Sequence, residues 1–207
     1  MRTFEKTHPW IKFELDLRKF DYKLWMALGE AESKCEHIAG VPLQPPTAEK
    51  LHLLYLAKGV RATTAIEGNT LTEEEVIERI EGKLSLPPSR EYLGKEVDNI
   101  VKGCNEIKGQ LMRGGSSGLS VAEMTAFNKT VLDGLERASD IVPGVIRKYS
   151  VGVAGYKGAP AEDCEYLLQR MCDWLNAPEF NPSEHAIIYS VIKAIAAHLY
   201  IAWIHPF

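Results

Sequence analysis

One segment near the end of the sequence constrains the fold more than any other. From about residue 184 to residue 204 it contains AIIYSVIKAIAAHLYIAWI, and a helix built from it would be apolar on nearly every side. Its length also suits a membrane span, but Lys193 lies in its middle, where insertion would cost about 2.5–3.5 kcal/mol, and His198 follows. We therefore expect no membrane span, but a central helix that other helices surround.

The rest of the sequence repeats apolar residues at three- and four-residue spacings, which are typical of amphipathic helices. Between residues 145 and 156 the period changes to two, with Tyr149, Val151 and Val153 on one side, and this pattern predicts a short β-hairpin. The stretch RGGSSG at residues 113–118 predicts a flexible linker. The fold class is therefore all-α, a helical bundle with a short β-hairpin. Apolar stripes with their capping residues predict helices over residues 21–38, 47–66, 72–82, 89–111, 120–135 and 160–176.

The charge, the first residues and the cysteines indicate an ordinary soluble protein. A net charge of −4 gives no direct nucleic-acid signal and no strong attraction to an anionic membrane. The first residues hold no uninterrupted apolar stretch of signal-peptide length, so the cytoplasm is the expected compartment. Cysteines with this wide spacing are not typical of zinc ligands, and we expect buried thiols at Cys35, Cys104, Cys164 and Cys172.

Two residues at predicted helix ends are candidates for chemistry. Glu67, in TTAIEGN, lies at a helix C-terminus, where the helix dipole disfavours a carboxylate and a cationic partner would offset the cost. An exposed acid beside a glycine turn is the alternative interpretation. His205 also ends a helix, before Pro206, and histidine is the usual side chain for proton transfer near neutral pH. A terminal histidine that only pairs with the helix dipole is the alternative there.

Several stretches in this order resemble the Fic (filamentation induced by cAMP) family of nucleotidyl transferases. TTAIEGN is similar to the family's inhibitory pattern, with Thr63, Glu67 and Gly68 at the characteristic positions and Asn69 next to them. PGVIRKYSVGVAGYKG looks like the family's flap hairpin, and LDLRKFDYKLWMALGEAESKCEHIAGVPL looks like its amino-terminal helical region. HPF, at residues 205–207, matches the start of a signature that normally continues HPFxDGNGRxxR.

The resemblance implies a fold, a reaction and a set of site residues. It implies an amino-terminal helical region with an inhibitory helix at residues 1–112 and the first part of the Fic core at residues 119–207, incomplete at its C-terminus. The implied function is an autoinhibited protein adenylyltransferase, with ATP as co-substrate and Mg²⁺, that modifies Ser, Thr or Tyr hydroxyls of a protein target or of itself. In these roles His205 is the general base, Glu67 blocks the γ-phosphate position, and the flap residues Val151, Gly152 and Val153 bind the target.

The sequence ends before the rest of the signature, so we expect this chain to be an amino-terminal portion without its own metal ligands. Three alternatives stay open at this point. The enzyme could transfer another phosphate-containing group, it could remove AMP, or the chain could be a non-catalytic helical interaction module. The oligomeric state is also open, with a homo-oligomer among the expected partners.

Overall fold

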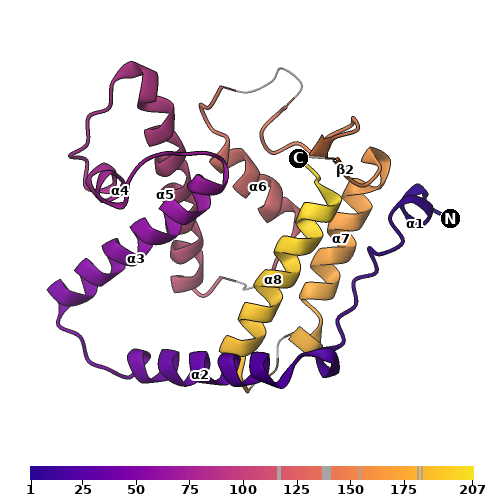
Figure 1. Cartoon of the computed structure of the whole chain (residues 1–207), viewed down its shortest axis with the longest axis horizontal. Coiled ribbons are helices and arrows are strands. Elements are labelled where there is room, and N and C mark those ends of the chain that lie inside the picture. The colour runs from indigo at the N-terminus through magenta and orange to yellow at the C-terminus, as the bar shows by residue number, and fades with distance from the viewer. Residues whose placement is uncertain (116–117, 137–140, 154, 181, 183) are drawn as a thin grey trace. The chain divides into compact units, whose positions relative to one another are not determined.

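The computed structural model describes residues 1–115, 118–136, 141–153, 155–180, 182 and 184–207 (Figure 1). Within these ranges it contains helices α1 to α8, four short 3₁₀ turns and one two-stranded antiparallel sheet. The prediction of an all-α fold with a short hairpin is therefore confirmed. The predicted linker at residues 113–118 includes residues 116 and 117, which lie outside the described residues.

Two compact units make up the chain, and neither is one continuous segment. The first unit contains Met1–Val41, Gly118–Glu123 and Ile146–Phe207, and the second contains Pro42–Ser117 and Met124–Val145. The sequence predicted a different division, into an amino-terminal helical region at residues 1–112 and the first part of a core at residues 119–207. That division stays a prediction.

The second unit is a helical cluster built on helices α3, α4 and α5 (Figure 1). Thr72 and Glu75 form the predicted capping box, in which the Thr72 hydroxyl accepts from the Glu75 N–H at 3.2 Å, so α4 begins directly after Thr72. The helices of this unit and its 3₁₀ turn are α3 (Pro45–Ile66), α4 (Glu73–Ile80), η2 (Pro88–Arg90), α5 (Glu91–Met112) and most of α6 (Val121–Val131). Its core consists of Ala57, Val60, Leu71, Val76, Leu93 and Val97.

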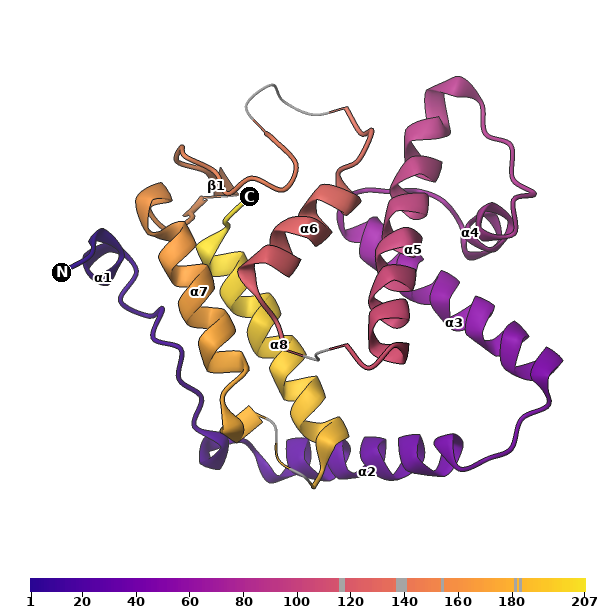
Figure 2. The same ribbon diagram turned by 180° about the vertical axis from the view of Figure 1, so that it is seen from behind.

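The first unit carries the hairpin and the last two long helices. Figure 2 shows α7 and α8 side by side, and α2 packs on α8 as well. Its elements are α1 (Thr3–Thr7), η1 (Leu17–Lys19), α2 (Tyr22–Ala39), β1 (Gly152–Val153), β2 (Tyr156–Lys157), η3 (Ala161–Asp163), α7 (Cys164–Leu175), η4 (Pro178–Phe180) and α8 (Ala186–Ile204). The inward face of α7 is fully apolar and consists of Cys164, Leu167, Leu168, Met171, Cys172 and Leu175.

Helix α8 differs from the expectation of a helix covered on all sides. Within its unit it buries one stripe at every fourth residue, namely Ile188, Ile192, Ala196, Tyr200 and Ile204. On another side Val191, Ile195 and Leu199 are 37%, 64% and 43% exposed. The physical reason is that α7 and α2 pack on one side of a helix whose sequence is apolar all round. Among the described residues α8 is also the one helix that is long and apolar enough to cross a bilayer.

Candidate functional site

His205 ends helix α8 in a strained backbone conformation. Its φ and ψ of 49° and 63° are left-handed, and its N–H donates to the Ile201 carbonyl at 2.7 Å. A left-handed conformation costs a non-glycine residue about 1–3 kcal/mol, so surrounding contacts must hold it. The next residue, Pro206, disfavours a right-handed helical conformation at His205, and this explains why the helix stops at Ile204.

The contacts that hold His205 come from Arg147, a residue that the sequence analysis did not single out. The Arg147 side chain is buried, its Nε donates to the His205 carbonyl, and its Nη2 donates to the Ile204 carbonyl at 3.1 Å. Its backbone N–H donates to the Pro206 carbonyl at 2.9 Å. The carbonyls at the end of a helix have no partner within the helix, and Arg147 satisfies two of them together with the next carbonyl along the chain.

The predicted flap hairpin exists and is shorter than the alternating pattern. Strands β1 and β2 pair antiparallel, with Gly152 opposite Lys157 and Val153 opposite Tyr156. Gly152 is exposed, and the Val153 side chain is 55% exposed. The predicted span of residues 145–156 includes residue 154, which lies outside the described residues.

Further contacts bring the hairpin against the end of α8, so the structure places two of the predicted site elements together. The Tyr156 hydroxyl donates to the Trp203 carbonyl at 2.8 Å, and burial raises its pKa. A Cβ on Gly158 would lie 3.0 Å from the His205 Cβ and 3.1 Å from the Arg147 Nη2, so only glycine permits this approach without a shift of its neighbours.

The predicted inhibitory residues lie in the second unit, at the end of α3. Glu67 is the exposed C-cap of α3, and Gly68 follows with a φ of 91°, a conformation that favours glycine. Thr63 is exposed, and its hydroxyl donates to the Gly59 carbonyl. The cationic partner expected for Glu67 is not found among the residues that the structure describes.

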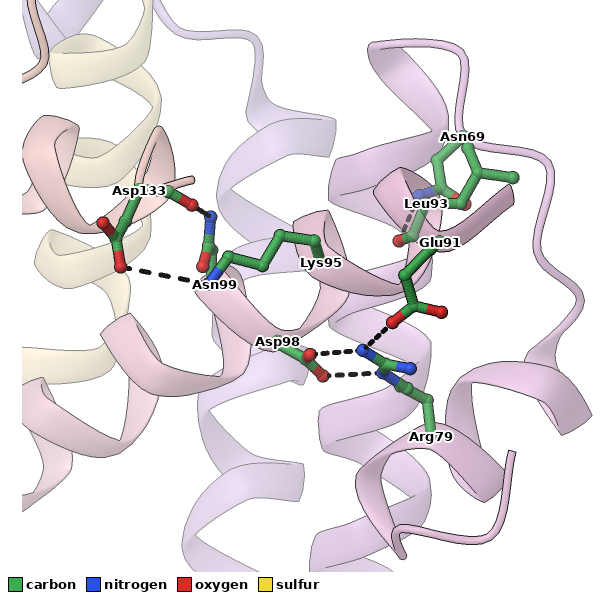
Figure 3. A network of polar contacts seen from close by, with 8 residues as sticks. All are labelled: Asn69, Arg79, Glu91, Leu93, Lys95, Asp98, Asn99 and Asp133. Carbon is green, nitrogen blue, oxygen red and sulfur yellow. Dashed lines mark hydrogen bonds and ion pairs between the residues drawn. The ribbon is translucent and has the colours of Figure 1, made fainter. Parts of the chain in front are cut away.

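Asn69 fixes this turn to helix α5 and is buried, at 8% exposure. Its Nδ2 donates to the Leu93 carbonyl at 2.9 Å and to Glu96 Oε2 at 2.8 Å, and its Oδ1 accepts from the Leu71 N–H at 3.0 Å. Figure 3 shows Asn69 beside Leu93. Asn69 therefore has a structural role that determines where the Glu67 turn lies on the second unit.

A polar network on the other side of α5 ties this helix to α4 (Figure 3). Both ends of the Arg79 guanidinium fork donate to the Asp98 carboxylate, at 3.0 and 2.7 Å, and Nη2 also donates to Glu91 at 2.8 Å. These contacts raise the pKa of Arg79, the hydrogen bond to Asp98 most of all. Arg79 and Asp98 also line a cavity of about 580 Å³ with Lys102 and Arg113. Because two carboxylates already engage Arg79, the network holds α4 and α5 together.

The described residues contain no group of three or more His, Cys, Asp or Glu side chains that could hold a metal ion. Magnesium is therefore assigned to no residue of the described chain. The expectation of four buried thiols was correct for Cys164 and Cys172 and wrong for Cys35 and Cys104, which are exposed. Burial raises the pKa of the Cys164 thiol, and it raises that of Cys172 to about 11.

Known proteins resemble this chain in sequence and in fold. Residues 118–207 match the model of the Fic/DOC family. The protein adenylyltransferase Fic of Drosophila willistoni is 28% identical over 150 residues, which cover 70% of this chain and 27% of that protein. A crystal structure of a Fic family protein from Desulfovibrio desulfuricans G20 superposes with a TM-score of 0.67 at 25% identity, covering 90% of this chain and 51% of that one. The matched part thus spans about a quarter of the curated relative and about half of the solved chain.

Proposed function

This chain belongs to the Fic family through residues 118–207, and from that premise we propose that it is the amino-terminal portion of a protein adenylyltransferase that transfers AMP from ATP to a hydroxyl of a protein target. The observation that carries the proposal is the placement of His205. The histidine stands at the end of α8, directly against the hairpin, on a backbone that Arg147 holds.

His205 is the proposed general base. Its imidazole makes no hydrogen bond with any residue that the structure describes, and the side chain is half-buried, so a ring nitrogen is available to a substrate. In the proposed step the hydroxyl oxygen of the target attacks the α-phosphorus of ATP, and the bond from that phosphorus to the bridging oxygen of pyrophosphate breaks. The hydroxyl proton passes to His205. A base in this position typically contributes 10²- to 10⁴-fold in rate.

The hairpin is the proposed docking site of the target. An exposed strand edge can pair with an extended peptide through main-chain hydrogen bonds, and such pairing tolerates many sequences. The segment that would pair is strand β1, Gly152–Val153, together with Val151 directly before it, and both residues of the strand are exposed. This tolerance would suit self-modification as well as a separate protein target, and it leaves a homo-oligomer as one proposed assembly.

ATP is the proposed co-substrate, as the family relationship implies. Magnesium would neutralise charge on the phosphates. The described residues contain no cluster of three or more His, Cys, Asp or Glu side chains that could hold a metal ion, so we propose that the phosphate and metal contacts come from a complete HPFxDGNGRxxR signature. The cytoplasm, where ATP is supplied, is the proposed compartment.

Glu67 is the proposed inhibitory residue. Its carboxylate is exposed at a helix C-terminus, where it gains nothing from the helix dipole, and it makes no ion pair with a described residue. In the proposed inhibited state it pairs with the second arginine of the signature and takes the place of the γ-phosphate. Movement of the α3 terminus would then allow ATP to bind productively.

The proposal is tested in a protein that carries residues 1–207 followed by a complete signature. Glu67→Gly is expected to raise the transfer of label from α-³²P-ATP to protein above the level of the parent. Glu49→Gly is the matched control, because Glu49 is an exposed glutamate on the same helix. His205→Ala is expected to abolish labelling in both backgrounds. Labelling of Glu67→Gly no higher than that of the parent and the control would refute autoinhibition, and labelling that survives His205→Ala would refute the assigned base.

A further inference from the structure

Arg147 is a buried arginine whose side-chain hydrogen-bond acceptors are all backbone carbonyls. It is 4% exposed, although arginine is almost never fully buried unless it is paired. Besides its bonds to His205 and Ile204, Nη1 donates to the Tyr149 carbonyl and Nη2 to the Ala159 carbonyl, both at 2.6 Å. No carboxylate forms an ion pair with it among the residues that the structure describes. The negative end of the α8 dipole and the four carbonyls therefore balance its charge.

These four carbonyls belong to three separate segments that carry the proposed site. Two lie at the end of α8, Tyr149 precedes strand β1, and Ala159 follows strand β2. A planar guanidinium presents its donors in a fixed fork, whereas a lysine ammonium is a compact point charge on a flexible stem. Only arginine can donate in these directions from one buried position. Arg147 thus fixes the base of the hairpin to the residue that ends α8.

Gly158 provides a second, independent observation on the same junction. A Cβ at position 158 would make three tight contacts, at 3.0 Å to His205 Cβ, 3.1 Å to Arg147 Nη2 and 3.3 Å to Val151 Cγ2, so its neighbours would have to shift by a few tenths of an ångström. The hairpin therefore approaches the histidine so closely that the side chain of any other residue at position 158 would displace one of these groups. Hydrogen bonding and close packing both join the hairpin to His205.

We infer that Arg147 is a positioning residue, which holds the imidazole of His205 and the target-docking hairpin in one fixed relation. This inference rests on the proposed function for the roles of base and hairpin. Arg147 acts through the carbonyls of His205 and Ile204 and through the left-handed backbone of His205, and it does not touch the reacting atoms. The relation matters because a misplacement of about 1 Å can cost 10²-fold in rate.

The first test measures geometry and needs no activity. In the 207-residue chain, ¹H–¹³C spectra of the histidine rings and the valine methyl groups are compared between the parent and Arg147→Lys. The ring signals of His205, assigned with His205→Gln, and the methyl signals of Val151 are expected to shift, while those of His185 stay unchanged. Arg170→Lys, an exposed arginine of α7 in the same unit, is the matched control and should leave all of these signals in place.

Gly158→Ala is the second variant, and it decides the matter if Arg147→Lys fails to fold. It leaves the charge and the donors of Arg147 intact and adds one methyl group against His205. The same shift of the His205 ring signals is expected. Unchanged His205 signals in a folded Arg147→Lys chain, or in Gly158→Ala when the lysine variant is unfolded, would overturn the inference.

The second test measures turnover in a protein with a complete signature. Arg147→Lys is expected to lower kcat for AMP transfer about 10- to 100-fold and to leave the KM for ATP within about twofold, because the base is misplaced while the nucleotide site is untouched. If the parent protein transfers AMP, an unchanged kcat in its Arg147→Lys variant would overturn the inference. A parent without AMP transfer would instead refute the proposed function, and the spectra would still decide whether Arg147 positions His205.

Discussion

Asn69 stabilises the second unit and also fixes the turn that carries the proposed inhibitory residue, Glu67. Its replacement by alanine should therefore affect both the stability and the proposed inhibition. The substitution removes two hydrogen bonds to backbone groups of buried residues, Leu71 N–H and Leu93 C=O, and one to the Glu96 carboxylate. A hydrogen bond between neutral groups contributes about 1 kcal/mol and one to a charged group about 1.5–3 kcal/mol. Because water can reach the half-buried Glu96, we expect Asn69→Ala to lower the free energy of unfolding by about 3 kcal/mol.

Asn99→Ala is the matched control for this experiment. Asn99 is 2% exposed, lies in the same unit, and donates to the carbonyls of Val131 and Asp133 at 2.9 and 2.8 Å. Its loss should cost about 2 kcal/mol, because two hydrogen bonds are removed and neither holds the Glu67 turn. Urea unfolding followed by circular dichroism measures both changes, and hydrogen exchange of the Leu71 amide should accelerate more in Asn69→Ala than in Asn99→Ala.

Asn69→Ala and Asn99→Ala should differ in the amount of AMP that is transferred to protein. With a complete signature, Asn69→Ala is expected to raise labelling, because the turn that carries Glu67 is no longer fixed to α5, while Asn99→Ala leaves labelling at the level of the parent. A loss of less than about 1 kcal/mol in Asn69→Ala would refute the structural reasoning, given three hydrogen bonds at stake. Equal labelling in both variants, with the expected loss of stability, would refute the link between this turn and inhibition.

Three further predictions concern the first unit and the thiols. Ellman's reagent should modify the exposed thiols of Cys35 and Cys104 at once in the native chain. It should modify the buried thiols of Cys164 and Cys172 only after unfolding. The hydrogen bond and charge of Glu32 raise the pKa of His185 above 6.5, so this pair stabilises the fold fully below about pH 6.5 and less as pH rises through the raised pKa. The difference in Tm between the parent and Glu32→Gln should therefore be largest near pH 6 and shrink as the pH is raised. Leu168→Ala, at a fully buried site of α7, should cost about 2–5 kcal/mol in urea unfolding, whereas Leu199→Ala, on the exposed side of α8, should cost less than about 0.5 kcal/mol.

Helix ends were predictable where a capping pair or a proline marks them. Two predicted ends were wrong, because α3 begins at Pro45, where Pro fits the first turn, and not at residue 47, and α6 ends at Val131 and not at residue 135. The capping pair Thr72 and Glu75 set the start of α4, and Pro206 with His205 set the end of α8. The face of a helix was harder to predict. In α8 nearly every residue is apolar, so no pattern selects the stripe that α7 and α2 cover. Cys104 shares the apolar stripe of α5 but is exposed, because the buried residues of α5 end at Gly103.

The candidate site was predictable where a residue type is unusual for its position, and not where a role depends on distant backbone. Glu67 and His205 stand out locally as an acid and a base at helix ends. Arg147 has the same parity as Tyr149 and Val151, so the alternating pattern could have indicated that it points inward with them. Its partners could not be found in this way, because the carbonyl of Ile204 lies 57 residues further along the chain.

The two proposed site residues occupy the same kind of position, and this shared position explains why a buried side-chain donor lies beside each of them. Both Glu67 and His205 stand where a helix ends, and there the chain turns into the left-handed region, at Gly68 in one case and at His205 itself in the other. A helix end frees a side chain from the packed stripe, but it also removes the hydrogen bonds that hold the backbone in place. Asn69 and Arg147 donate side-chain hydrogen bonds at these two positions, to the carbonyls of Leu93 and His205 respectively. Substitutions of such donors should therefore alter inhibition or turnover even though the carboxylate and the imidazole remain.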